Sequence, residues 1–172
     1  MALLYLDACA LIDAREKSTP GSRALVDLIA EGSGTETPFI TSDLTLLEVL
    51  TKPNQGLIDR TSDREDPASR ANHDWYLKNL VPDGLLFRTM PLHREILLHA
   101  AIMRARIPSL KTPDAIHAAT AHHFGCTHFL TGDAKLMRGM ERDAAWLMSP
   151  DRFTFVQLTA AALDALRTEL FS

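Results

Sequence analysis

The chain has 172 residues, of which 46% are hydrophobic and 23% charged, and this balance excludes a disordered polymer. A chain of this length can bury roughly 70% of its unfolded surface, so we expect one domain whose stability needs neither a metal nor a disulfide. The formal net charge of −4 argues against a protein that coats nucleic acid by bulk attraction, although it leaves room for a local basic surface.

The cysteines and the start of the chain bear on the cellular compartment. Cys9 and Cys126 are the only cysteines, and such a pair is expected to be two reduced thiols rather than a disulfide framework. The apolar run 3–6 meets Asp7 and has no basic segment before it, so we expect no signal peptide. No stretch approaches the ~18 apolar residues of a membrane span. We therefore expect a cytoplasmic protein that does not enter a membrane.

Short apolar runs recur along the chain, each closed by polar or turn-forming residues. This pattern is typical of strands buried on both faces. The strands that we predict are 3–6, 38–41, 85–90, 127–131 and 153–158.

Segments with helical spacing or helix-capping residues lie between these runs. A possible capping box at 13–16 predicts that a helix begins shortly after the first strand. Ser42 or Asp43 would cap a helix that ends near Pro53, and Thr112 would cap one that runs to Gly125. The other predicted helices are 22–31, a helical turn at 75–80, 94–106, 134–140 and a C-terminal helix rich in Ala and Leu.

The stretch 54–73 is polar, and we interpret it as a loop or weak helix connecting parts of one domain. Elsewhere short strands alternate with helices. This alternation predicts a three-layer α/β/α domain with a mainly parallel sheet of about five strands.

Four acidic residues lie in apolar surroundings. Asp7 closes the first predicted strand, Asp133 follows the fourth, and open parallel sheets place ligands at these strand ends. Glu48 falls on or beside the apolar face of its helix, and Asp114 starts another helix.

Each acid also has a purely structural interpretation. Asp7 could cap the turn that follows it, and Glu48 could lie at the edge of its helix. Asp114 could complement the helix dipole, and Asp133 could be a turn residue and helix cap. Four converging carboxylates would nevertheless repel one another unless a cation lay between them. Oxygen-only ligation indicates Mg²⁺ or Mn²⁺ rather than zinc, and such ions at a strand-end cleft suit phosphodiester hydrolysis.

Four segments around these acids resemble the PIN-domain ribonucleases, and among them the VapC-type toxins of toxin–antitoxin pairs. They occur in the family's order and are YLDACALI at 5–12, LTLLEV at 44–49, TPDAIHAATA at 112–121 and LTGD at 130–133. The third is the most specific, and the ordered set is a strong signal.

The resemblance implies that Asp7, Glu48, Asp114 and Asp133 hold one or two Mg²⁺ or Mn²⁺ ions that activate water for attack on RNA. It also implies that Thr131 supports the site, that a small antitoxin protein is the partner, and that the chain forms a homodimer. Position 9 departs from the pattern, because the family commonly has Ser or Asn where this chain has Cys9.

Basic residues close to two of the acids could meet RNA phosphates, or could form a solvated helix face. They are Lys111, Lys135, Arg138 and Arg142, with Arg104 and Arg106 further away. Setting the four acids aside leaves as many acidic as basic residues. The net charge is therefore compatible with a modest basic rim around a metal site.

Other interpretations compete with the nuclease. A zinc site at His122, His123, Cys126 and His128 is disfavoured, because the segment passes from a helix end into a strand. We interpret His99 and His117 as helix-face residues, although His117 could touch the site. A haloacid-dehalogenase-type phosphatase would need an acid at position 9 and would leave Glu48 and Asp114 without roles. A non-catalytic PIN-like domain that binds RNA or a protein stays open.

Overall fold

The computed structural model describes residues 2–34, 36–58 and 66–171 and contains a six-stranded sheet in the order β3-β4-β2-β1-β5-β6. Every pair of neighbouring strands is parallel. The strands are β1 Leu4–Leu6, β2 Phe39–Ser42, β3 Leu80–Val81, β4 Phe87–Met90, β5 His128–Thr131 and β6 Thr154–Gln157.

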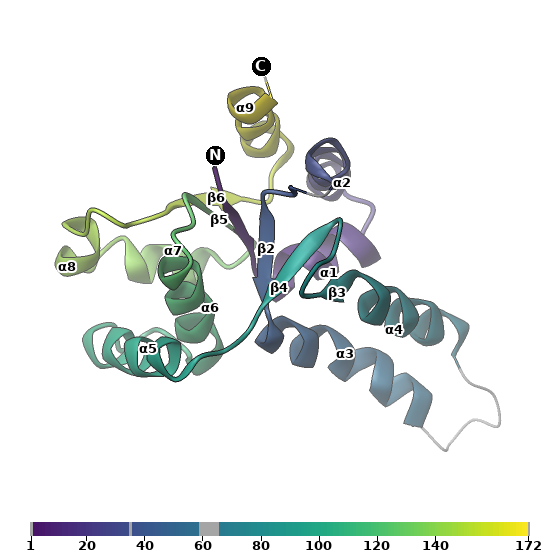
Figure 1. Cartoon of the computed structure of the whole chain (residues 1–172), viewed down its shortest axis with the longest axis horizontal. Helices are drawn as coiled ribbons and strands as arrows, with labels where there is room; N and C mark the ends of the chain where they lie inside the picture. Colours follow the sequence, from purple (N-terminus) through teal and green to yellow (C-terminus); the bar gives the residue numbers. More distant parts are fainter. Residues whose placement is uncertain (1, 35, 59–65, 172) are drawn as a thin grey trace.

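Helices cover both faces of this sheet, with α5 to α8 on one side and α1, α2 and α4 on the other (Figure 1). Their bounds are α1 Ala8–Glu16, α2 Pro20–Gly32, α3 Asp43–Ile58, α4 Pro67–Asn79, α5 Arg94–Arg106, α6 Thr112–His123, α7 Ala134–Met140, α8 Ala144–Leu147 and α9 Ala160–Phe171. The predicted three-layer α/β/α architecture with a parallel sheet is confirmed.

Alternate residues of the central strand face two separate apolar cores. Leu4 and Leu6 of β1 pack with side chains of α1, α2 and α9, whereas Tyr5 packs with side chains of α5, α6 and α7. All three are fully buried. Because β1 pairs with β2 on one side and β5 on the other, the strand order changes direction at β1. Ligands of open parallel sheets bind at such a point, beyond the carboxyl ends of the strands.

The first helix begins earlier than we predicted. The capping box at 13–16 is wrong, because Asp7 itself is the N-cap and α1 follows β1 without a connection. Asp13 lies inside this helix and forms an ion pair with Lys17 in the next turn. The acid that ends the first strand therefore also starts the first helix.

Helix α3 continues to Ile58, so the predicted end near Pro53 is wrong. A proline inside a helix removes one hydrogen bond, and here tertiary packing outweighs that cost. Pro53 is buried, and α3 packs so closely on α4 that a Cβ at Gly56 would lie 2.2 Å from Ser69 Oγ.

The segment 54–73 is mostly helical where it is described. Residues 54–58 complete α3, and 67–73 form the first half of α4, which replaces the short turn predicted at 75–80. Residues 59–65 of this predicted connection lie outside the described part.

Smaller differences concern short elements and one cap. The two-residue edge strand β3 and the single-turn helix α8 were not predicted. The strand predicted at 85–90 begins at Phe87. Lys111, not Thr112, is the N-cap residue of α6, and it makes no side-chain capping bond. Within the described residues, no helix is both long and apolar enough to cross a membrane.

Candidate functional site

Asp7 lies where β1 ends and is 5% exposed. Its Oδ1 accepts a hydrogen bond from the backbone N–H of Ala10 at 2.8 Å, and its Oδ2 accepts one from the hydroxyl of Thr131 at the end of β5. The Thr131 hydroxyl oxygen in turn accepts the backbone N–H of Asp133 at 2.9 Å. Thr131 therefore joins two of the four acids singled out in the sequence.

Burial raises the pKa of Asp7 to about 6. The hydrogen bond from Thr131, the nearby His117 and the N–H of Ala10 oppose this rise, whereas the neighbouring Glu48 carboxylate adds to it. The protein thus places a carboxyl group where its charge is poorly compensated. A bound cation would favour the ionised form of such a group.

Glu48 is held by a buried series of hydrogen bonds that begins at side chains of strands β1 and β2. Its Oε2 lies 2.7 Å from Nε2 of His117 on α6. Nδ1 of the same ring lies 2.7 Å from the Tyr5 hydroxyl, which lies 2.9 Å from Oγ of Ser42. Tyr5 and Ser42 are fully buried, and His117 is 3% exposed. The ring of His117 therefore fixes the position of the Glu48 carboxylate.

The sequence alone indicated only part of this series of hydrogen bonds. The sequence predicts that His117 is a helix-face residue that could touch the site, and in the structure its ring lies within hydrogen-bond distance of Glu48. Tyr5 and Ser42 were not singled out. The one available signal was a tyrosine in an otherwise aliphatic buried strand, since a buried hydroxyl usually has a hydrogen-bond partner.

Asp114 and Asp133 form the other half of the acidic region. Burial and then the Asp133 carboxylate raise the pKa of Asp114, whereas Lys111 opposes the rise. Asp133 is the N-cap of α7, and its Oδ1 accepts the backbone N–H groups of Lys135 at 2.7 Å and Leu136 at 3.1 Å. Asp7 and Asp133 therefore do act as helix caps, as their structural interpretation required. A carboxylate has about four acceptor sites, so capping leaves room for a further ligand.

Electrostatic effects pair the four acids. The Glu48 carboxylate helps to raise the pKa of Asp7, and the Asp133 carboxylate helps to raise that of Asp114. The Thr131 hydroxyl joins the two pairs, because it bonds both the Asp7 carboxylate and the Asp133 N–H. Burial raises the pKa of the Cys9 thiol to about 12, and the nearby Asp7 and Asp133 carboxylates add to the rise. The thiol therefore stays neutral at physiological pH.

The four acids are not arranged as the ligands of one metal ion. In the described part of the chain, no three His, Cys, Asp or Glu side chains stand close enough together to hold one metal ion. Among the described residues this holds for the four acids and for His122, His123, Cys126 and His128. The structure brings the predicted acids into one region without placing them in ligating geometry.

A groove with a volume of about 580 Å³ opens beside the acids. Cys9 and Asp133 line it together with Lys111, Lys135 and Arg138, three of the basic residues predicted to contact RNA. Acidic and basic side chains thus border the same depression.

Solved structures with a similar fold cover most of the chain. The DNA-bound VapBC from Salmonella typhimurium aligns with a TM-score of 0.60 at 15% identity, over 92% of this chain and 99% of that chain. FitAcB from Neisseria gonorrhoeae aligns with a TM-score of 0.58 at 19% identity, over 80% and 92%. A toxin–antitoxin complex from Klebsiella pneumoniae aligns with a TM-score of 0.51 at 18% identity, over 89% and 97%. At identities this low, the structural similarity establishes a common fold and nothing more specific.

Sequence comparison provides the family. No curated protein matches the chain, but the model of the PIN domain matches residues 4–142. This match includes all four acids and the predicted resemblance is confirmed at the level of the family. The chain belongs to the PIN domain family.

Proposed function

We propose that this protein is a metal-dependent endoribonuclease that cleaves RNA phosphodiester bonds, and that it is the toxin of a type II toxin–antitoxin pair in the cytoplasm. The observation that carries the proposal is the acidic region at the change in strand order, with Asp7 buried there at a raised pKa. Membership of the PIN domain family and the basic groove beside Asp133 support it.

The donor set suits a hard cation. Asp7, Glu48, Asp114 and Asp133 offer only carboxylate oxygens, the ligands that Mg²⁺ and Mn²⁺ prefer. Such an ion, when bound, supplies an activated water and neutralises charge on the phosphate. Burial of Asp7 at a raised pKa is the structural sign that this carboxyl group lacks a counter-charge.

Each protein group has a separate task in this proposal. Thr131 and the Ala10 N–H orient Asp7, and His117 orients Glu48. Lys111, Lys135 and Arg138 hold the phosphates of the RNA. Their contacts carry charge recognition rather than base recognition.

The test is cleavage of labelled RNA by the purified protein with Mg²⁺ or Mn²⁺. We expect cleavage that stops in EDTA and in the variant Asp7→Asn but continues in Asp151→Asn, a matched change at an exposed acid. DNA of the same sequence shows whether the sugar matters. RNA cleavage that survives both EDTA and Asp7→Asn would refute the metal assignment.

A second candidate is a PIN-like domain that binds RNA or a protein without cleaving. The absence of ligating geometry among the described acids favours it. RNA binding without cleavage at any Mg²⁺ or Mn²⁺ concentration would establish this alternative. The phosphatase alternative is removed, because the chain belongs to the PIN domain family.

We also propose two protein contacts. The similarity to a toxin–antitoxin complex supports a small antitoxin partner that covers the acidic cleft. Leu98 and Ile102, each about half exposed and one turn apart on α5, support a homodimer through this helix. Light scattering of the purified chain, alone and with the product of a neighbouring short reading frame, tests both. A chain that stays monomeric and does not bind that product would contradict both proposed contacts.

A further inference from the structure

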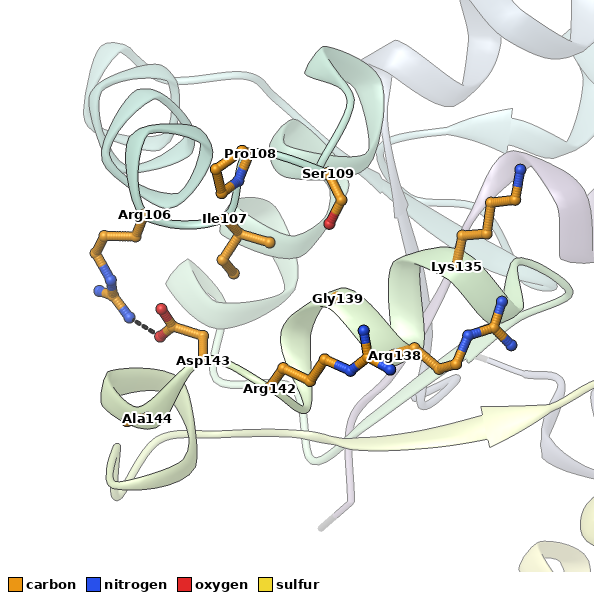
Figure 2. Close-up of a pocket in the computed structure, with 10 residues that line it drawn as sticks. All are labelled: Arg106, Ile107, Pro108, Ser109, Lys135, Arg138, Gly139, Arg142, Asp143 and Ala144. Atoms are coloured by element: carbon orange, nitrogen blue, oxygen red, sulfur yellow. Dashed lines mark hydrogen bonds and ion pairs between the residues drawn. The ribbon is translucent and has the colours of Figure 1, made fainter.

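A second groove continues from the acidic region along helix α7. Its volume is about 440 Å³, and it lies between α7 and the end of α5 with the loop 107–109 (Figure 2). Lys135 and Arg138 line both this groove and the one beside Asp133, so the two depressions meet at these side chains. We call the second depression the α7 groove.

One side of the α7 groove is a basic stripe. Arg138, Gly139 and Arg142 lie three, four and seven residues after Lys135, which places all four along one face of α7 and the turn after it. Lys135 and Arg138 extend away from the Arg106–Asp143 ion pair in Figure 2. Like charges at this spacing repel one another. The stripe therefore favours an anion in front of it.

In the described part of the chain, no acid forms an ion pair with this stripe. Asp143 is the one acidic residue that lines the groove in the described part of the chain. It is already paired with Arg106 and also accepts the N–H of Trp146 at 2.7 Å to cap α8. Its hydrogen bond with Arg106 lowers the pKa of its carboxyl group. Within the described residues, Lys135, Arg138 and Arg142 form no ion pair.

The opposite wall keeps the groove narrow and supplies a hydroxyl. A Cβ at Gly139 would lie 3.1 Å from Oγ of Ser109 and 3.6 Å from Cγ2 of Ile107, so the absence of a side chain at position 139 leaves the backbone of α7 facing the loop. Ser109 makes no hydrogen bond within the described residues and is exposed. Its hydroxyl is free to donate to an oxygen of a bound ligand.

Resting on the proposed function, we infer that the α7 groove binds the phosphates of an RNA strand that continues from the cleavage site. From Lys135 to Arg142 the stripe extends about 10 Å at ~1.5 Å per residue, which covers on the order of two to three phosphates. No aromatic side chain lines the groove in the described structure, so no base is stacked there. The groove therefore adds affinity that depends on charge and is independent of base sequence.

The test is binding of a fluorescent single-stranded RNA of about 20 nucleotides, followed by anisotropy in EDTA so that the RNA stays intact. We expect Arg142→Gln to weaken binding roughly threefold to tenfold and to reduce the slope of log affinity against log salt by about 0.7. Arg23→Gln on α2, a matched change of an exposed arginine on another face, should leave both unchanged. A double variant, Arg138→Gln with Arg142→Gln, should lower the slope by about twice as much.

The outcomes separate this inference from the proposed function. Cleavage of RNA with Mn²⁺ by the wild type, together with an Arg142→Gln variant that binds RNA as the wild type does, would overturn the α7 groove and leave the nuclease intact. Equal losses in Arg142→Gln and Arg23→Gln would overturn it too, because the effect would then be one of net charge. RNA binding that depends on Arg142 without any cleavage supports the groove and refutes the nuclease.

Discussion

The substitution Asp7→Asn should stabilise the metal-free protein at neutral pH. Asn is also a good helix cap, so its side-chain oxygen can still accept the N–H of Ala10 and keep α1 in place. Its amide can donate to the hydroxyl oxygen of Thr131, which reverses the present hydrogen bond without breaking the contact. The variant therefore removes a buried charge while it retains the surrounding geometry.

The magnitude follows from the pKa of Asp7. The folded protein holds this proton with a pKa of about 6, compared with 3.8 for the group in its ordinary state. The folded state thus binds the proton more tightly, so the contribution of Asp7 to stability is greatest below about pH 4 and is lost as the pH rises through 6. At ~1.36 kcal/mol per pH unit, the loss is at most about 3 kcal/mol. We expect the free energy of unfolding of Asp7→Asn to exceed that of the wild type by about 1–3 kcal/mol at pH 7.5.

Urea unfolding in EDTA at pH values from about 4 to 8 measures this difference. Titrating groups that do not interact with Asp7 contribute equally to both proteins, so the difference between their free energies of unfolding reports on Asp7 and the groups coupled to it. Asp151→Asn, at an exposed acid, should follow the wild type at every pH. An Asp7→Asn variant that is less stable than the wild type at pH 7.5, or that shows the same pH dependence, would refute the argument from burial.

Other perturbations test the remaining contacts by the same unfolding assay. Mn²⁺ at about one hundred times its Kd should stabilise the wild type by about 2.7 kcal/mol and Asp7→Asn by much less; equal gains would contradict a site at Asp7. His117→Ala should cost about 2–4 kcal/mol, and His117→Gln should recover part of it, because glutamine keeps a donor for Glu48. Gly21→Ala should cost about 1–3 kcal/mol, since its Cβ would lie 2.2 Å from the carbonyl oxygen of Leu158; an unchanged midpoint would refute that close approach.

Local patterns were sufficient for most of the fold. The apolar runs around Leu4–Leu6 and His128–Thr131 predicted strands correctly because both are buried on two faces and need no partner-specific information. The same positions fixed where Asp7 and Asp133 leave the sheet. Local rules failed at Pro53, where packing of α3 on α4 keeps a helix going that its own sequence would end.

The sequence by itself determined the fold class and the PIN resemblance, and it identified four acids at strand ends and on helices, because strand ends and helix starts are local features. Only the tertiary structure decided how those acids are held. His117 meets Glu48 across 69 residues and Tyr5 across 112, and Thr131 meets Asp7 across 124. Likewise, the α7 groove exists only because the end of α5 and the loop 107–109 fold against α7. Contacts so distant along the chain depend on how whole elements pack, and no local pattern encodes that packing.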